Sequence, residues 1–205
     1  YENANPFELH EPGGYLDVHD ARYAALDERR VRVTGSRWVP AENYTVKLEA
    51  ARVVGYQATV LVLLRDAHYV ANAREWVAKL NTFLVEHIDA VMDLREGDYA
   101  LEFRLIGVDA TLGALETAAV TPAEVGVLCI ITAANQALAT EIACLANPWL
   151  LHFPLRADEE LPTFAFAHSP AHCERGALYE FALHHVMQLE DPMAAFRLEV
   201  HEVGG

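Results

Sequence analysis

The stretch QATVLVLL, residues 57–64, decides the fold that we expect for this chain. Its apolar residues follow one another almost without interruption, whereas a strand with one face in water alternates apolar and polar residues. Such a run is typical of a central strand that is covered on both faces. We therefore predict a sheet with this strand in its interior.

A long amphipathic helix is predicted directly after this strand. Apolar residues recur at helical spacing over residues 69–92. Asp66 can cap the start of this helix, and residues 93–98, which contain Gly97, would end it.

Shorter β-rich runs lie before the central strand, over residues 30–37 and 44–51. The alternation in VRVTG and YTVKLE is typical of strands with one buried face. Together with the long helix, these runs predict that residues 1–95 form a β-rich unit closed by that helix.

A second unit is predicted from residue 96 onward. YALEFRLIG (99–107) alternates, and VGVLCIIT (125–132) is an apolar strand. Asn135 can cap an Ala-rich helix, and Pro148 should end or kink this helix just beyond Ala146.

The tail of the chain also has strand-like alternation, over residues 179–185 and again over residues 196–203. A helix stays an alternative for the first of these two segments. The predicted fold class is α+β, with mixed or antiparallel sheets and packed helices. A ferredoxin-like arrangement is a candidate for residues 96–205, although the strand order cannot be read from the sequence.

Composition excludes several classes of function. Thirty acidic residues against fifteen basic ones give a net charge of −15, which disfavours the phosphate contacts of nucleic-acid binding. No apolar run reaches the length of about 18 residues that a spanning helix needs, and the first residues lack a signal-peptide pattern. We therefore expect no nucleic-acid partner and no membrane insertion. The Ala-, Val-, Leu- and Arg-rich composition is typical of a high-GC bacterial protein.

The three cysteines, Cys129, Cys144 and Cys173, form no CxxC pair and are odd in number. They suggest a reducing cytoplasm rather than a disulfide framework. Cys129 and Cys144 lie in apolar or Ala-rich segments, so we interpret them as inert buried thiols and reject cysteine nucleophile chemistry. The hydrolase patterns GxSxG, HExxH and SxxK are absent from the sequence.

The turn EPGG, residues 11–14, is the first candidate ligand site. Its glycines allow backbone N–H groups to approach an anion, and Asp17 and His19 follow within a few residues. The commoner interpretation is a tight turn before a strand. Lys47 and Glu49 share a strand face and could form an acid/base pair, although an exposed ion pair is the commoner arrangement.

Two further clusters contain side chains of functional types. Residues 65–68 (RDAH) lie where a strand meets a helix, which is a usual place for ligand groups but also an ordinary helix start. His168, His172 and Cys173 are metal-ligand types within six residues, but Pro170 breaks the helix that such a pair would need. We expect no metal site.

The chain resembles the acyclic terpene utilisation (AtuA) family of bacterial proteins. The resemblance rests on ENANPF, HEPGG, DARY, RVRVTGSR and YTVKLEAAR in the first sixty residues, and on LYEFALHHVM near the end. It implies that these residues are the later portion of a longer protein, with a nucleotide-binding-like α/β region preceding them. In the family, apolar and Asp residues commonly stand where this chain has His168 and His172, which argues against a metal shared by the family.

The resemblance implies a part in degrading acyclic terpenoids such as geraniol and citronellol, or related organic acids, as coenzyme A thioesters. Lyase or hydratase chemistry on an acyl thioester is the enzymatic hypothesis, with a preceding region or companion subunit completing the cleft. A noncatalytic structural or assembly module is the alternative. Under either hypothesis we expect a homo-oligomer. The need for a cofactor is left open by the sequence. The residues that we expect to act are Asp17 and Lys47 in catalysis and Glu11, Gly13, Gly14 and Arg52 in binding the acid or thioester.

Overall fold

A computed structural model describes residues 5–43, 45–95, 97–118, 121–161, 164–191, 193–194 and 196–201. The chain divides into two compact units, which we describe separately. Unit 1 comprises residues 1–52 and 180–205, and unit 2 comprises residues 53–179. The boundary predicted near residue 96 falls inside unit 2, and the division into 1–95 and 96–205 stays a prediction.

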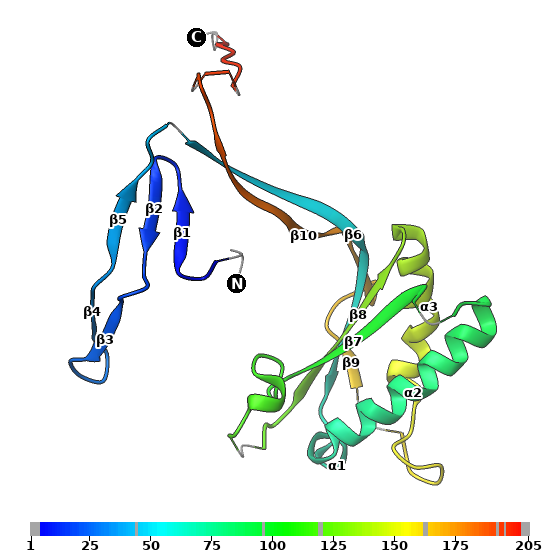
Figure 1. The fold of residues 1–205 in the computed structure, drawn as a ribbon. Helices are drawn as coiled ribbons and strands as arrows, with labels where there is room; N and C mark the ends of the chain where they lie inside the picture. Colours follow the sequence, from blue (N-terminus) through cyan, green and yellow to red (C-terminus); the bar gives the residue numbers. More distant parts are fainter. Residues whose placement is uncertain are drawn as a thin grey trace. The chain divides into compact units, whose positions relative to one another are not determined.

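Unit 2 is built around one antiparallel sheet with two long helices packed on it. Its strands are the later part of β6 (Thr45–Leu64), β7 (Tyr99–Ile106), β8 (Val125–Ala133), β9 (Phe164–Phe166) and the first part of β10 (His172–Gln188). The sheet order is β10-β6-β8-β7, and β9 also pairs with β6 (Figure 1). With α2 between β6 and β7 and α3 after β8, this is the order of a ferredoxin-like split βαβ fold. The α+β class is confirmed, but β6 and α2, which the sequence assigned to the first unit, begin the ferredoxin-like arrangement.

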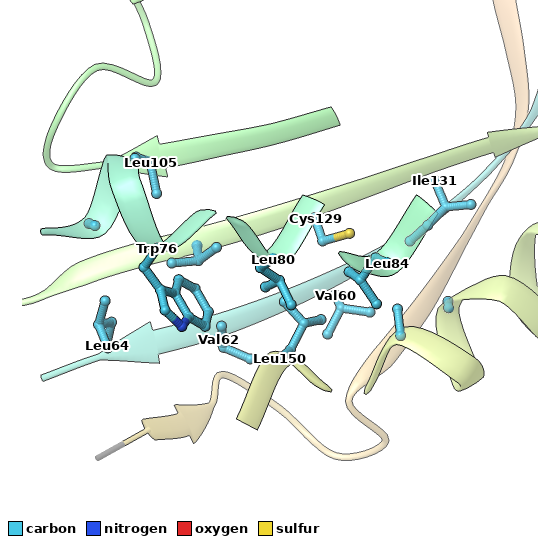
Figure 2. Packing of buried hydrophobic residues seen from close by; sticks show 14 of the residues in the cluster. Val60, Val62, Leu64, Trp76, Leu80, Leu84, Leu105, Cys129, Ile131 and Leu150 are labelled. Carbon is cyan, nitrogen blue, oxygen red and sulfur yellow. The ribbon is translucent and has the colours of Figure 1, made fainter. Parts of the chain in front are cut away.

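The core of unit 2 lies on one face of this sheet. Alternate residues of β6 and β8 are fully buried, and α2 and α3 cover them with further apolar side chains (Figure 2). The fully buried residues include Val60, Val62, Leu64, Trp76, Leu80, Leu84, Ile131 and Leu150. On the other face, Leu61, Leu63, Leu128 and Ile130 are only half-buried. The prediction of a doubly covered strand is therefore wrong, because both helices pack on the same face.

The helices follow the predicted segments with two differences. The long helix is divided at Asn72 into α1 (Ala67–Ala71) and α2 (Ala73–Met92), and Asp66 caps α1 by accepting hydrogen bonds from His68 and Tyr69. The α3 helix (Gln136–His152) continues through Pro148, so the expected end near Ala146 is wrong. Burial of Leu150 and packing of the Trp149 ring on Phe83, at 4.5 Å between centroids, favour continuation over the lost hydrogen bond.

Unit 1 consists of short strands and the ends of two long ones. Its strands β1 (Glu8–Glu11), β2 (Gly14–Asp17) and β5 (Arg37–Pro40) form a three-stranded antiparallel sheet. A separate hairpin joins β3 (Arg22–Ala25) to β4 (Val31–Thr34). The beginning of β6 and the end of β10 also belong to this unit.

The long strands differ from the sequence prediction. The runs predicted at 44–51 and 57–64 are joined in one strand, β6, because β10 pairs alongside it. The strand predicted at 179–185 is confirmed within β10, which removes the helix alternative. The strand predicted at 196–203 is wrong over residues 196–201, which have no regular structure, and the remaining two residues lie outside the described residues.

Candidate functional site

A charged cluster on the three-stranded sheet of unit 1 is the candidate site. Asp17 ends β2 and lies directly opposite Arg37 of β5 in the strand register. One carboxylate oxygen, Oδ2, accepts hydrogen bonds from Arg37 Nε at 3.0 Å and Nη2 at 2.8 Å. Two charge-assisted hydrogen bonds from one guanidinium therefore converge on a single carboxylate oxygen, and the other oxygen is left for a second partner.

The second oxygen of Asp17 holds His19. Asp17 Oδ1 accepts a hydrogen bond from the His19 backbone N–H at 3.0 Å and contacts the ring Nδ1 at 2.9 Å. Because an ionised carboxylate can only accept, Nδ1 carries the proton and Nε2 of neutral His19 has the free lone pair. The Phe7 ring stacks on the imidazole at 5.1 Å between centroids and further restricts its orientation.

Asp17 is buried, although Arg37 and His19 beside it are exposed. The hydrogen bonds from His19, and then the one from Arg37, hold the pKa of Asp17 far below its ordinary value. Asp17 is thus ionised at neutral pH and is poorly suited to exchange a proton itself. Its geometry suits a residue that orients His19.

The EPGG turn is held by hydrogen bonds within the chain. The Gly13 N–H donates to Thr45 Oγ1 at 2.7 Å, so the donor expected for an anion is used internally. Gly14 lies against β5, where a Cβ would come within 2.7 Å of the Trp38 indole. A close approach of two strands therefore explains the second glycine.

Lys47 is joined to the same turn through Glu11. Its Nζ lies 3.3 Å from Glu11 Oε1 and 3.0 Å from Glu49 Oε1. The hydrogen bond to Glu49, opposed by partial desolvation and reinforced by Glu11, raises the pKa of Lys47, so the ammonium form is favoured. Two carboxylates beside one ammonium leave a local excess of negative charge. This favours an ion-pair role over proton abstraction.

Arg52 lies apart from Lys47. The two residues are five positions apart on β6, so their side chains project to opposite faces of the strand. Arg52 Nε donates to Glu180 Oε1 at 2.6 Å, which ties β6 to β10. The structure thus brings Glu11, Gly13 and Lys47 together and places Asp17 on the neighbouring strand, but it does not bring Arg52 to them.

Other candidates have structural explanations within the described residues. Asp66 is a helix cap, as the commoner interpretation of RDAH predicted. His168 Nδ1 contacts the Pro170 carbonyl oxygen at 2.8 Å, and the described residues contain no group of three metal-binding side chains. Of the helices described, none is both long and apolar enough to cross a membrane.

Comparison with known proteins decides the family. The family model described as acyclic terpene utilisation family protein AtuA matches residues 1–154, which is most of the chain. The chain belongs to the AtuA family. Membership links it to acyclic terpene utilisation. A search of curated proteins and a search of solved structures each found no match.

One contact in this AtuA-family chain was missed from the sequence. Cys144 on α3 is exposed, not buried as predicted, and its Sγ lies 3.7 Å from His172 Nδ1 on β10. Two further hydrogen bonds connect α3 to β10 beside this contact. Thr140 Oγ1 donates to Glu174 Oε1 at 3.0 Å, and the Gly176 N–H donates to Gln136 Oε1 at 3.0 Å. The signal available in the sequence is the i, i+4 spacing of Gln136, Thr140 and Cys144 facing alternate residues of a strand. That signal becomes readable only once α3 and β10 are known to be neighbours.

Proposed function

We propose that this chain is part of a cytoplasmic bacterial enzyme that degrades acyclic terpenoids, or related organic acids, as coenzyme A thioesters. Lyase or hydratase chemistry fits the proposal, with His19 as general base and Asp17 as its positioning residue. The observation that carries the proposal is the 2.9 Å contact of His19 Nδ1 with the buried Asp17 carboxylate. A preceding region or companion subunit completes the cleft.

The proposed chemistry uses the free nitrogen of His19. In hydration of an α,β-unsaturated thioester, the water oxygen bonds to the β-carbon while a water proton moves to His19 Nε2. The same proton then passes to the α-carbon, so the imidazole returns to its neutral form. Asp17 stabilises the transient imidazolium and fixes the tautomer, and Arg37 keeps Asp17 ionised.

Lys47 as a catalytic residue stays a prediction, as do Glu11, Gly13, Gly14 and Arg52 as ligand-binding residues. The substitution Lys47→Met distinguishes a catalytic Lys47 from one that only forms ion pairs. Unchanged turnover in the full protein that contains this chain would remove Lys47 from the mechanism. Reduced turnover with an unchanged fold would keep it.

The main test is turnover of coenzyme A thioesters by the full protein carrying His19→Gln. Loss of a general base lowers kcat by about 10²–10⁴-fold. Asp17→Asn should also lower kcat and alter the pH–rate profile, because the amide no longer selects the required tautomer. His10→Gln is the matched control, since His10 is an exposed histidine on β1 whose nearest carboxylate, Glu8, lies at 3.6 Å. Equal activity of the His19 and His10 variants would refute the proposal.

A noncatalytic assembly module is the second candidate. The observation that favours it is that Lys47 and Arg52 are both engaged in ion pairs within the chain. The enzyme hypothesis and the assembly-module hypothesis differ most in the activity that they predict for substituted chains. An assembly module would tolerate His19→Gln and Lys47→Met in every activity assay, yet its removal would change the size of the assembly.

A further inference from the structure

We infer that the free edge of β7 pairs with β7 of a second copy of this chain, antiparallel and about a two-fold axis at Phe103. The pairing would join two five-stranded sheets into one continuous sheet. The inference rests on unit 2 alone and does not depend on the role proposed for His19.

The first observation is that β7 is a long edge strand among the described residues and lacks proline, lysine and a bulge, three of the features that prevent edge pairing. It is the last strand in the order β10-β6-β8-β7, and its register with β8 is uninterrupted from Tyr99 opposite Ala133 to Ile106 opposite Gly126. Its sequence, YALEFRLI, has no proline, no lysine and no bulge. Such an edge presents unpaired N–H and C=O groups to any strand that fits it.

The second observation is that hollows border this edge along its length. One is lined by Leu101, Phe103 and Leu105 together with residues of α2, and a second continues past Tyr99. A third lies between residues 102–104 and the loop 109–114. The middle of β7 is therefore bordered by open hollows on the side of α2 and on the side of the loop.

The third observation, which selects the occupant, is the self-complementary order of charges. With Phe103 on the axis, Glu102 of one copy faces Arg104 of the other, and Arg104 of the first faces Glu102 of the second. Opposite charges directly across an antiparallel pair are stabilising, and like charges are destabilising. Glu102 and Arg104 lie on the same sheet face and already form an ion pair within the chain, at 2.6 Å from Nε to Oε1. Turning each side chain toward the other copy exchanges the two pairs within the copies, one in each, for two pairs between them.

The apolar residues of β7 match in the same register. On the side of α2, Leu101 faces Leu105 of the second copy and the two Phe103 rings meet at the axis. On the exposed side, Ala100 faces Ile106, a residue with 46% of its surface exposed. Tyr99 faces Gly107, whose missing side chain leaves room for the ring. A shift of one or two residues would lose the charge match, so the register is specified.

Net charge provides the opposing force. Two chains of −15 repel one another, and this repulsion weakens as salt is added because the Debye length shortens. The dimer should therefore form more tightly at moderate than at very low ionic strength.

Sedimentation velocity of the 205-residue chain at moderate ionic strength, over a concentration series, tests the inference. Arg104→Glu places two like-charged pairs across the axis, as does Glu102→Arg, and each should raise the dimer dissociation constant by about tenfold or more. An equimolar mixture of the two variants should dimerise again. In the mixed dimer, the two acidic side chains of the Arg104→Glu copy face the two basic side chains of the Glu102→Arg copy. The double variant E102R/R104E should also dimerise as the parent chain does.

Arg197→Glu is the control for net charge, since it makes the same change of charge as Arg104→Glu at an exposed residue outside the strands. Circular dichroism of each variant checks that the sheet is intact. A parent chain that sediments as a monomer at every concentration would overturn the inference. An oligomer that persists equally in both single variants would also overturn it, because association would then use another surface.

Discussion

Unit 1 and unit 2 of this chain differ in the interactions that stabilise each of them internally. The core cluster of buried apolar residues lies within unit 2, from Ala58 of β6 to Leu155 after α3. Among the described residues of unit 1, Val46 is the buried hydrophobic side chain, and the buried polar ones are Asp17 and Thr45. The comparison teaches that unit 2 is stabilised by apolar burial, whereas unit 1 depends on strand pairing and ion pairs.

Exposed apolar residues sharpen this contrast. In unit 1, Tyr23 has 70% of its surface exposed, and Val31 and Trp38 are at least half exposed. The β3–β4 hairpin has no buried residue. Apolar surface of this kind commonly marks an interaction site. Because the large apolar side chains are buried in unit 2 and mostly exposed in unit 1, we expect their truncation to lower the free energy of unfolding far more in unit 2.

The largest effect is expected for Leu84→Ala in unit 2. Leu84 is fully buried on α2, beside β6, and its truncation leaves a cavity (Figure 2). The free energy of unfolding should fall by about 2–5 kcal/mol. Trp38→Ala in unit 1 removes more atoms, yet the unfolding free energy of unit 2 should change by less than about 0.5 kcal/mol.

Urea unfolding monitored by hydrogen exchange in α2 and β8 measures both changes. Equal losses in the two variants would show that unit 2 depends on unit 1 for its stability. In that case the division into separately stabilised units would be wrong.

The next effect is expected in unit 1, for Gly14→Ala. The added Cβ would meet the Val39 carbonyl oxygen and come within 2.7 Å of the Trp38 ring, so β2 and β5 must separate. Crowding of this kind costs about 1–3 kcal/mol. Faster hydrogen exchange is expected in β2 and β5, with no change in unit 2.

Gly13→Ala is the matched comparison. Gly13 has a φ of 83°, which strains an L-residue, but an added Cβ there meets no atom within 4 Å. A left-handed alanine costs about 1–2 kcal/mol. If the backbone conformation rather than strand contact controlled this hairpin, Gly13→Ala would be the more damaging substitution of the two.

Regular periodicity explains which parts of this fold could be predicted. The apolar run at 57–64 and the helical spacing at 69–92 are local signals, and both mark true elements. The single covered face of the sheet could not be predicted, because it depends on where α3 packs. The same holds for Pro148, where contacts made by Trp149 and Leu150 outweigh a local preference.

The candidate site was predictable only in part. Asp17 was selected from its place after the EPGG turn, but Arg37 was not, although the two are opposite in register. The two residues are twenty positions apart, with the β3–β4 hairpin between them, so no short-range spacing signals their contact. Likewise Cys144 and His172 meet across 28 positions. Chemistry that depends on pairing between distant strands and helices needs the tertiary structure.

The smallest effect that distinguishes the units is their response to acid. The pKa of Asp17 is lower in the folded chain than in the unfolded chain, chiefly through hydrogen bonds from His19 and Arg37. Ionised Asp17 therefore stabilises unit 1 above the ordinary carboxyl pKa of about 3.9, and this stabilisation is lost as the pH falls below that value. Hydrogen exchange in β2 and β5 should accelerate on acidification below about pH 4 relative to Asp17→Asn, in which the group cannot titrate.

Asp27→Asn is the control for this titration. Asp27 also has a lowered pKa, through the Arg29 N–H and the Arg30 side chain, but it lies in the turn of the β3–β4 hairpin. Its substitution should leave the acid response of β2 and β5 unchanged. If Asp17→Asn and the parent chain lose protection in β2 and β5 at the same pH, the Asp17–Arg37 pair does not stabilise the sheet. The structure of unit 1 would then have to rest on its strand hydrogen bonds alone.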